Sequence, residues 1–176
     1  MRALGGPPLP KPRMISVRPA TPLDIAAVDA MLARSYGPLL RADYPPSALV
    51  VALPRMARAQ PQLLASGHYF LAEEEGAILG AGGWSWAAPG DGRRVPRLGH
   101  VRHVATDSRA VRRGVGRAVM EAVLDDARES GMERLSCLST LTAVPFYRAM
   151  GFWEVRRRDL AFGGVAFPAV EMARGL

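Results

Sequence analysis

The chain has 176 residues, 49% of them hydrophobic and 22% charged, which fits one globular domain with a sizeable core and leaves little room for a second. No stretch approaches the run of about 20 apolar residues that a membrane-spanning helix needs, and the N-terminus shows no export signal, so we expect a cytoplasmic protein. Cys137 is the only cysteine and there are three histidines, which excludes an internal disulfide and argues against a metal site.

The net charge is +7, and Lys11 is the only lysine among 23 basic residues, so arginine supplies nearly all of the positive charge. Such a composition invites a nucleic-acid interpretation. The arginines are spread from Arg2 to Arg174, however, and no aromatic residues alternate with them to form a stacking platform. We therefore favour a solvated basic surface with one local anion site.

Residues 1–12 carry four prolines and two glycines without periodicity, which predicts a flexible leader before a folded domain over residues 13–176. Alternation over Met14–Arg18 predicts a strand. Thr21 is followed by a proline and then by an acid, which is typical of a helix start, and apolar residues at helical spacing extend this helix to about Tyr36.

The middle of the chain predicts a short helix and three strands. Recurring prolines leave room for a helix around Ser47–Leu53, which continues past Pro54 only with a kink. Two apolar runs, His68–Glu73 and Ala77–Trp86, are separated by a short acidic turn and predict an antiparallel hairpin. A third apolar run, Leu98–Ala105, follows a loop rich in glycine, proline and arginine.

The last third of the chain has the clearest pattern. Apolar residues recur at every third and fourth position and predict a helix over Gly114–Ser130, which a glycine ends. A strand over Leu135–Thr140, a short helix over Ala143–Met150 and two final strands, Phe152–Arg156 and Val165–Ala173, follow. The mixture of strands and helices predicts an α+β or mixed α/β domain around one sheet.

The segment between the third apolar run and the long helix favours an anion site. Its sequence, Arg112-Arg113-Gly114-Val115-Gly116-Arg117, lies where free N–H groups and the helix dipole attract a phosphate. Gly114 and Gly116 lack the β-carbons that would hold a phosphate away from these amides, and the arginines add charged donors. The alternative is a tight turn flanked by solvated arginines.

Two familiar phosphate motifs fail at this turn. A P-loop requires Lys and then Ser or Thr after its second glycine, where this chain has Arg117 and Ala118. A dinucleotide fingerprint requires a third glycine at the position of Val119.

The turn resembles the coenzyme A signature of the GNAT family of N-acetyltransferases. The family pattern is Gln or Arg, two variable residues, Gly, one variable residue and Gly or Ala, and residues 111–116 match it except at Val111. The later segment Thr142–Phe152 resembles the second recurring element of the family, with Phe-Tyr and Gly-Phe pairs. The resemblance implies a single domain with a mostly antiparallel twisted sheet of about six or seven strands, flanked by about four helices.

The resemblance also implies acetyl-coenzyme A as co-substrate and gives roles to individual residues. Tyr147 would protonate the leaving thiolate as general acid. The pantetheine arm would pair with the backbone of Val104, Ala105 and Thr106. The remaining coenzyme-binding positions that it implies are Arg112, Arg113, Gly114, Val115, Gly116, Arg117, Thr142 and Phe146.

Attack by an amine on a thioester needs a proton acceptor, and His100 on the signature strand is our candidate, because imidazole titrates in the useful range. Glu73 on the preceding hairpin, or a water molecule, is the alternative base. Strand alternation places His103 on the opposite face from His100, where we expect it to pack in the interior.

The acceptor site should be built from residues outside the coenzyme motifs. Trp84 and Trp86 share one strand face beside the loop 87–97, and together with Glu73 they are candidates for the acceptor pocket, although core packing is an alternative. Tyr36 and Tyr69 are weaker candidates. Cys137 has no base near it in sequence, so we interpret it as a packing residue.

These observations favour an N-acetyltransferase that moves an acetyl group directly from acetyl-coenzyme A to a primary amine on a small molecule or a peptide. Two alternatives stay open, a catalytically silent domain that binds or senses coenzyme A and a basic nucleic-acid-binding protein. Relatives that resemble the chain often dimerise, so a homodimer is also expected.

Overall fold

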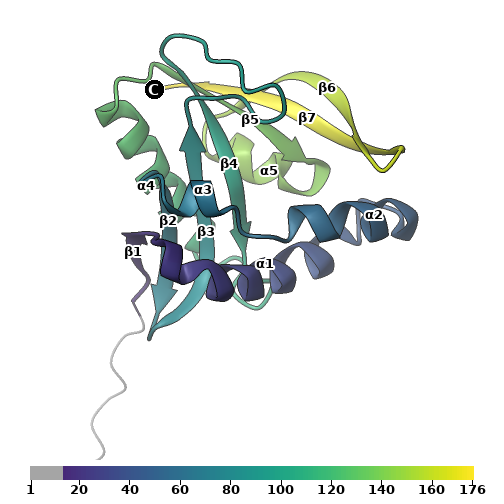
Figure 1. The fold of residues 1–176 in the computed structure, drawn as a ribbon, viewed down its shortest axis with the longest axis horizontal. Helices are drawn as coiled ribbons and strands as arrows, with labels where there is room; N and C mark the ends of the chain where they lie inside the picture. The colour runs from purple at the N-terminus through teal and green to yellow at the C-terminus, as the bar shows by residue number, and fades with distance from the viewer. Residues whose placement is uncertain (1–13) are drawn as a thin grey trace, which may run out of the picture.

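The computed structural model describes residues 14–176 and consists of a single seven-stranded sheet with helices on both faces (Figure 1). The strand order is β1-β2-β3-β4-β5-β7-β6. The strands are β1 (Ser16–Pro19), β2 (Tyr69–Glu74), β3 (Ala77–Ser85), β4 (Leu98–Thr106), β5 (Arg134–Thr140), β6 (Trp153–Phe162) and β7 (Val165–Gly175). The predicted mixed α+β fold around one mostly antiparallel sheet is confirmed, whereas the leader predicted for residues 1–12 lies outside the described residues.

The helices divide between the two faces of the sheet. Their bounds are α1 (Ile25–Leu40), α2 (Pro46–Met56), α3 (Pro61–Leu64), α4 (Val115–Glu129) and α5 (Val144–Ala149), with single 3-10 turns η1 (Pro22–Asp24) and η2 (Leu141–Ala143). One hydrophobic cluster joins α4 and α5 to one face of the sheet, and two others join α1, α3 and α2 to the opposite face. In the described part of the chain, no helix is both long and apolar enough to cross a bilayer.

The contact between β4 and β5 is the feature of the sheet that matters most for function. It is the only parallel pairing among the described strands, and it is limited to Leu98–His100 against Arg134–Ser136. Both strands continue for several residues beyond this contact, β4 to Thr106 and β5 to Thr140, without pairing with each other. The sheet therefore opens between the two strands toward their C-terminal ends.

The structure differs from the sequence prediction at four elements. Helix α1 continues through Pro38 to Leu40, and α2 contains Pro54 within one continuous helix. The four-residue helix α3 was not predicted. Strand β6 is twice as long as expected, because pairing with β7 carries it to Phe162 even though most of its side chains are exposed. Charged residues such as those of β6 are common on edge strands, which explains why no apolar alternation indicated it.

Candidate functional site

Gly114 and the start of α4 form the predicted anion-binding turn. Gly114 is the N-cap of the helix and has φ +83°, a left-handed conformation that favours glycine, and Arg112 just before it has φ +63°. The first hydrogen bond of the helix runs from the Ala118 N–H to the Gly114 carbonyl at 3.0 Å. The three N–H groups before Ala118 therefore have no partner within the helix and are free to bind an anion.

Gly116 brings the turn into contact with the later segment Thr142–Phe152. A β-carbon at Gly116 would lie 3.1 Å from the ring of Phe146 in α5 and 3.3 Å from Oγ1 of Thr106 at the end of β4. Such separations are tighter than most real β-carbon contacts, so a larger side chain would displace the phenyl ring. The glycine thus allows β4, α4 and α5 to converge beside the open amides.

The arginines of the turn have different surroundings. Arg113 donates to Glu74 on β2 at 2.5 Å, and that carboxylate is only 9% exposed, so this pair anchors the turn to the sheet. Arg117 lies 3.9 Å from Glu121 in a largely exposed pair, which holds it weakly. Arg112 forms no ion pair within residues 14–176. Arg112 and Arg117 are therefore the cations of the turn that remain available to a ligand.

Asp107 fixes the loop between β4 and the turn. Its carboxylate is almost fully buried and accepts hydrogen bonds from Arg109 at 2.9 Å and from Arg34 of α1 at 2.6 Å. Its own N–H donates to Leu79 of β3 at 2.8 Å. The hydrogen bonds from Arg109 and Arg34 lower the pKa of Asp107 well below its usual value. These contacts hold the loop against α1 and against β3, a role that the sequence did not suggest.

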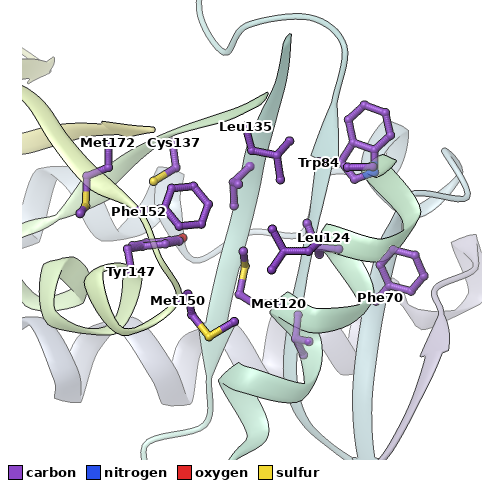
Figure 2. Close-up of a cluster of buried hydrophobic side chains, with 14 of the residues drawn as sticks. Phe70, Trp84, Met120, Leu124, Leu135, Cys137, Tyr147, Met150, Phe152 and Met172 are labelled. Atoms are coloured by element: carbon purple, nitrogen blue, oxygen red, sulfur yellow. The ribbon is translucent and has the colours of Figure 1, made fainter. Parts of the chain in front are cut away.

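Tyr147 lies in the core between α5 and the sheet (Figure 2). Its side chain is 6% exposed, and its ring meets those of Phe146 and Phe152 edge to face, each at 5.3 Å between centroids. Burial, with a smaller contribution from Cys137, raises the pKa of Tyr147 well above 10. The phenol is therefore protonated at neutral pH, as a general acid must be.

His100 lies where the opening between β4 and β5 begins, at the end away from Thr106. It forms the last β4–β5 pair, with Ser136, and its Nε2 atom is buried without a hydrogen-bond partner in the described part of the chain. Burial, followed by the charge of Arg102, lowers the pKa of His100, so its imidazole is neutral at physiological pH. A cavity of about 140 Å³ adjoins it, and Cys137, the neighbour of Ser136, also lines that cavity.

His103 does not lie on the face that strand alternation predicts. Opposite Gly82, β4 carries an extra residue, and His103 there has φ +51°, so the strand bulges. Val101 and Val104 consequently both pack toward α4, while His103 meets the ring of Tyr36 in α1 at 6.3 Å. His100 and His103 thus point to the same face of the sheet. Burial lowers the pKa of His103 to about 4, and its Nδ1 also lacks a partner among the described residues.

Two candidates for the acceptor pocket prove to be structural. Trp84 has no exposed surface and donates from Nε1 to Asp126 of α4 at 2.6 Å, so it has no surface to offer a substrate. Glu73 accepts from Nη2 of Arg18 at 2.7 Å on β2, which β3 separates from β4, so it is remote from the opening. Only Trp86 of the tryptophan pair is accessible, at 38%.

The remaining candidates also have defined surroundings. Thr142 donates its hydroxyl to Asp43, in the connection between α1 and α2, at 2.7 Å. Tyr69 is buried and donates to the His103 carbonyl at 3.0 Å, on the face of the sheet opposite α4. Cys137 is buried, and desolvation raises the pKa of its thiol to about 12, in agreement with a packing role.

Sequence reasoning missed most residues around the cavity beside His100. They come from the loop after β3, from β4 and β5, and from the β6–β7 hairpin, and the charged ones are Asp91, Arg93, Arg156, Arg158 and Glu171. These residues come from separate segments of the chain, so no single sequence motif contains them. The only available signal was the run of arginines at 156–158.

Comparisons with known proteins find the same fold in solved N-acetyltransferases. A GCN5-related N-acetyltransferase from Rhodopseudomonas palustris superposes with a TM-score of 0.74 at 18% identity, covering 97% of this chain and 100% of that one. The PaiA N-acetyltransferase from Thermoplasma acidophilum, solved in complex with coenzyme A, gives 0.68 at 10% identity, with coverage of 93% and 99%. The ribosomal-protein-S18-alanine N-acetyltransferase from Escherichia coli gives 0.63 at 18% identity, with coverage of 92% and 94%.

The family itself follows from the sequence. The family described as acetyltransferase (GNAT) matches residues 34–152, well over half of the chain, and the protein therefore belongs to this family. No curated protein sequence matches the chain.

Proposed function

We propose that this protein is an N-acetyltransferase that moves an acetyl group from acetyl-coenzyme A to a primary amine by direct transfer in a ternary complex. The observation that carries the proposal is the opening between β4 and β5. Tyr147 lies on its α5 side and His100 on its other side, and adjacent β5 residues, Cys137 and Ser136, adjoin them. The opening thus leads from a proton donor to a proton acceptor.

The residues at the start of α4 fit the diphosphate of the coenzyme. The free N–H groups after Gly114 and the guanidinium groups of Arg112 and Arg117 supply donors of the kind that phosphate oxygens accept. Residues Val104, Ala105 and Thr106 continue from there along β4, on a strand edge that β5 leaves unpaired. From Thr106 back to His100 that edge spans about 20 Å, which suits an extended pantetheine arm.

In this mechanism, His100 takes a proton from the attacking amine, directly or through a water molecule, as the nitrogen–carbon bond forms. Tyr147 donates its phenolic proton to the sulfur as the carbon–sulfur bond breaks. The lowered pKa of His100 and the raised pKa of Tyr147 keep both groups in the protonation states that these roles require at neutral pH. His103 is the alternative base, because it shares the face and also has a free ring nitrogen.

Three measurements test the proposal. Acetyl-coenzyme A should raise the melting temperature and shift the amide resonances of Gly114 and Gly116, whereas ATP and NAD should not. Release of free thiol with a panel of primary amines should then follow. Binding without thiol release for any amine would replace the proposal with a coenzyme-sensing domain, and unmoved resonances at saturating coenzyme would remove it altogether.

A further inference from the structure

The cavity beside His100 carries an excess of positive charge. Three guanidinium groups line it, those of Arg93, Arg156 and Arg158, against two carboxylates, Asp91 and Glu171. His100 adds none, because its lowered pKa keeps it neutral at physiological pH. A cavity with unbalanced positive charge favours a negatively charged group in its occupant.

The arginines are not satisfied by the protein itself. Arg156 and Arg158 both donate to the same oxygen of Glu171, Oε2, at 2.7 and 3.4 Å. One oxygen uses a single N–H from each guanidinium group, although each group carries five N–H donors in a planar fork. Arg93 forms no ion pair in the described part of the chain. Donors suited to an anion therefore remain free on three residues that line the cavity.

The size and position of the cavity limit the occupant. A volume of about 140 Å³ is small beside the roughly 300–1,000 Å³ of sites for drug-sized ligands, so it suits a group of amino-acid size. His100, whose buried Nε2 has no partner among the described residues, lines the cavity at the last β4–β5 pair, where the two strands begin to separate. An amine that reaches His100 would place a group a few bonds away among the arginines.

We propose that the acceptor is a small primary amine that carries an anionic group, held by Arg93, Arg156 and Arg158 while the amine faces His100. The inference rests on the proposed transferase function and adds the substrate class of the same site. A carboxylate and a phosphate both accept from guanidinium groups in this way. The anion orients the amine, and the arginines take no part in the proton transfers.

The experiment compares matched amines with acetyl-coenzyme A in the thiol-release assay. β-Alanine and glycine are paired with their amides, and phosphoethanolamine is paired with ethanolamine. The anionic member of at least one pair should show kcat/KM higher by about tenfold or more, the effect of one or two charge-assisted hydrogen bonds. The carboxylate and phosphate pairs show which anion the site prefers.

Substitution of Arg158 and of its neighbour Arg157 supplies the control. Arg158→Gln should reduce the preference for the anionic member by about tenfold. Arg157 lies on the same strand but pairs with Val170, on the face of the hairpin opposite Glu171, and does not line the cavity. Arg157→Gln should therefore leave the preference unchanged while removing the same charge from the protein.

Equal or higher rates for the neutral members would overturn this inference and leave the transferase proposal intact. Equal losses of preference in the Arg157 and Arg158 variants would also overturn it, because a general surface charge would then explain the result. If no amine of either kind released thiol, the transferase proposal would fail and this inference with it.

Discussion

The two sides of the opening between β4 and β5 are built in different ways. On the α4 side, the turn that we propose binds the coenzyme comes from six consecutive residues, 112–117, and is fixed by close contacts such as that of Gly116 with Phe146. On the other side, the cavity beside His100 takes its charged residues from the loop after β3 and from the β6–β7 hairpin, which lie far apart in the sequence. The first side has little freedom to change without losing its shape, whereas the second can change one residue at a time.

This difference separates what is common to a family from what is particular to one member. A ligand shared by all members needs the same backbone amides every time, and glycines that allow such approach leave a short, readable pattern. An acceptor that differs between members needs only side chains on a fixed scaffold. The variants below test whether the two sides carry these separate tasks.

The largest effect is expected from Tyr147→Phe. Without its hydroxyl the departing thiolate has no proton donor, so kcat should fall by about 10²–10⁴-fold while coenzyme affinity is unchanged. Tyr69→Phe removes another buried hydroxyl, which donates to the His103 carbonyl, and should cost stability without a comparable loss of kcat. Thiol release and thermal shift with coenzyme measure the two quantities. Equal rate losses in both variants would reduce Tyr147 to a packing residue.

The second effect concerns the proton acceptor. His100→Gln should lower kcat/KM by about 10²-fold, and more than His103→Gln does. Because the pKa of His100 is lowered from 6.5, protonation of this base should slow the wild-type enzyme only when the pH falls below 6.5. The pH profiles of wild type and both variants decide the matter. The reverse ranking would assign the base to His103.

Gly116→Val should weaken coenzyme binding by at least about tenfold, because the new side chain displaces Phe146 and closes the approach to the amides. Gly114→Ala is the matched change. A β-carbon at that position meets nothing within 4 Å, so only the strain of φ +83° opposes it, and affinity should fall less. Calorimetric titration with coenzyme A compares them. Similar affinities for the Val variant and the wild type would place the coenzyme elsewhere.

His103 should make the protein sensitive to mild acid. Its pKa is about 4 in the folded state and 6.5 in the unfolded chain, so only the unfolded chain gains a proton between these values. The folded protein is therefore destabilised as the pH falls from 6.5 toward 4. At pH 5 the free energy of unfolding should be lower than at pH 7 by about 2 kcal/mol. Urea unfolding at pH 7 and pH 5 measures it. His103→Gln should flatten this dependence, and an unchanged slope would refute the assignment.

The smallest effect is expected from Thr142→Val. The substitution removes the hydrogen bond to Asp43 and should lower the free energy of unfolding by about 1 kcal/mol. Coenzyme affinity should stay the same, because the hydroxyl faces the α1–α2 connection. A loss of affinity would instead restore Thr142 to the coenzyme site that the family resemblance implies.

Local patterns in the sequence predicted the fold well, and the coenzyme-binding role of residues 112–117 stays a prediction. The long helix after Gly114 and the hairpin of β2 and β3 follow from spacing within short windows, whereas the place of Phe146 beside the turn was implied only by the family resemblance. The failures share a physical cause, which is that contacts distant in sequence decided the outcome. The bulge at His103 reverses an alternation argument, and the hydrogen bond from Trp84 to Asp126 turns a candidate pocket wall into core.

The short parallel contact between β4 and β5 divides the sheet into two leaves, that is, a four-stranded part and a three-stranded part. The two leaves are paired with each other only near His100. Backbone groups along the inner edges of both leaves lack the neighbour that a continuous sheet would provide. A linear molecule with its own amides, bound between the leaves, would supply hydrogen-bond partners to both edges and so hold the two leaves together. Amide hydrogen exchange along these two edges should then slow when such a molecule binds, while the outer strands keep their rates.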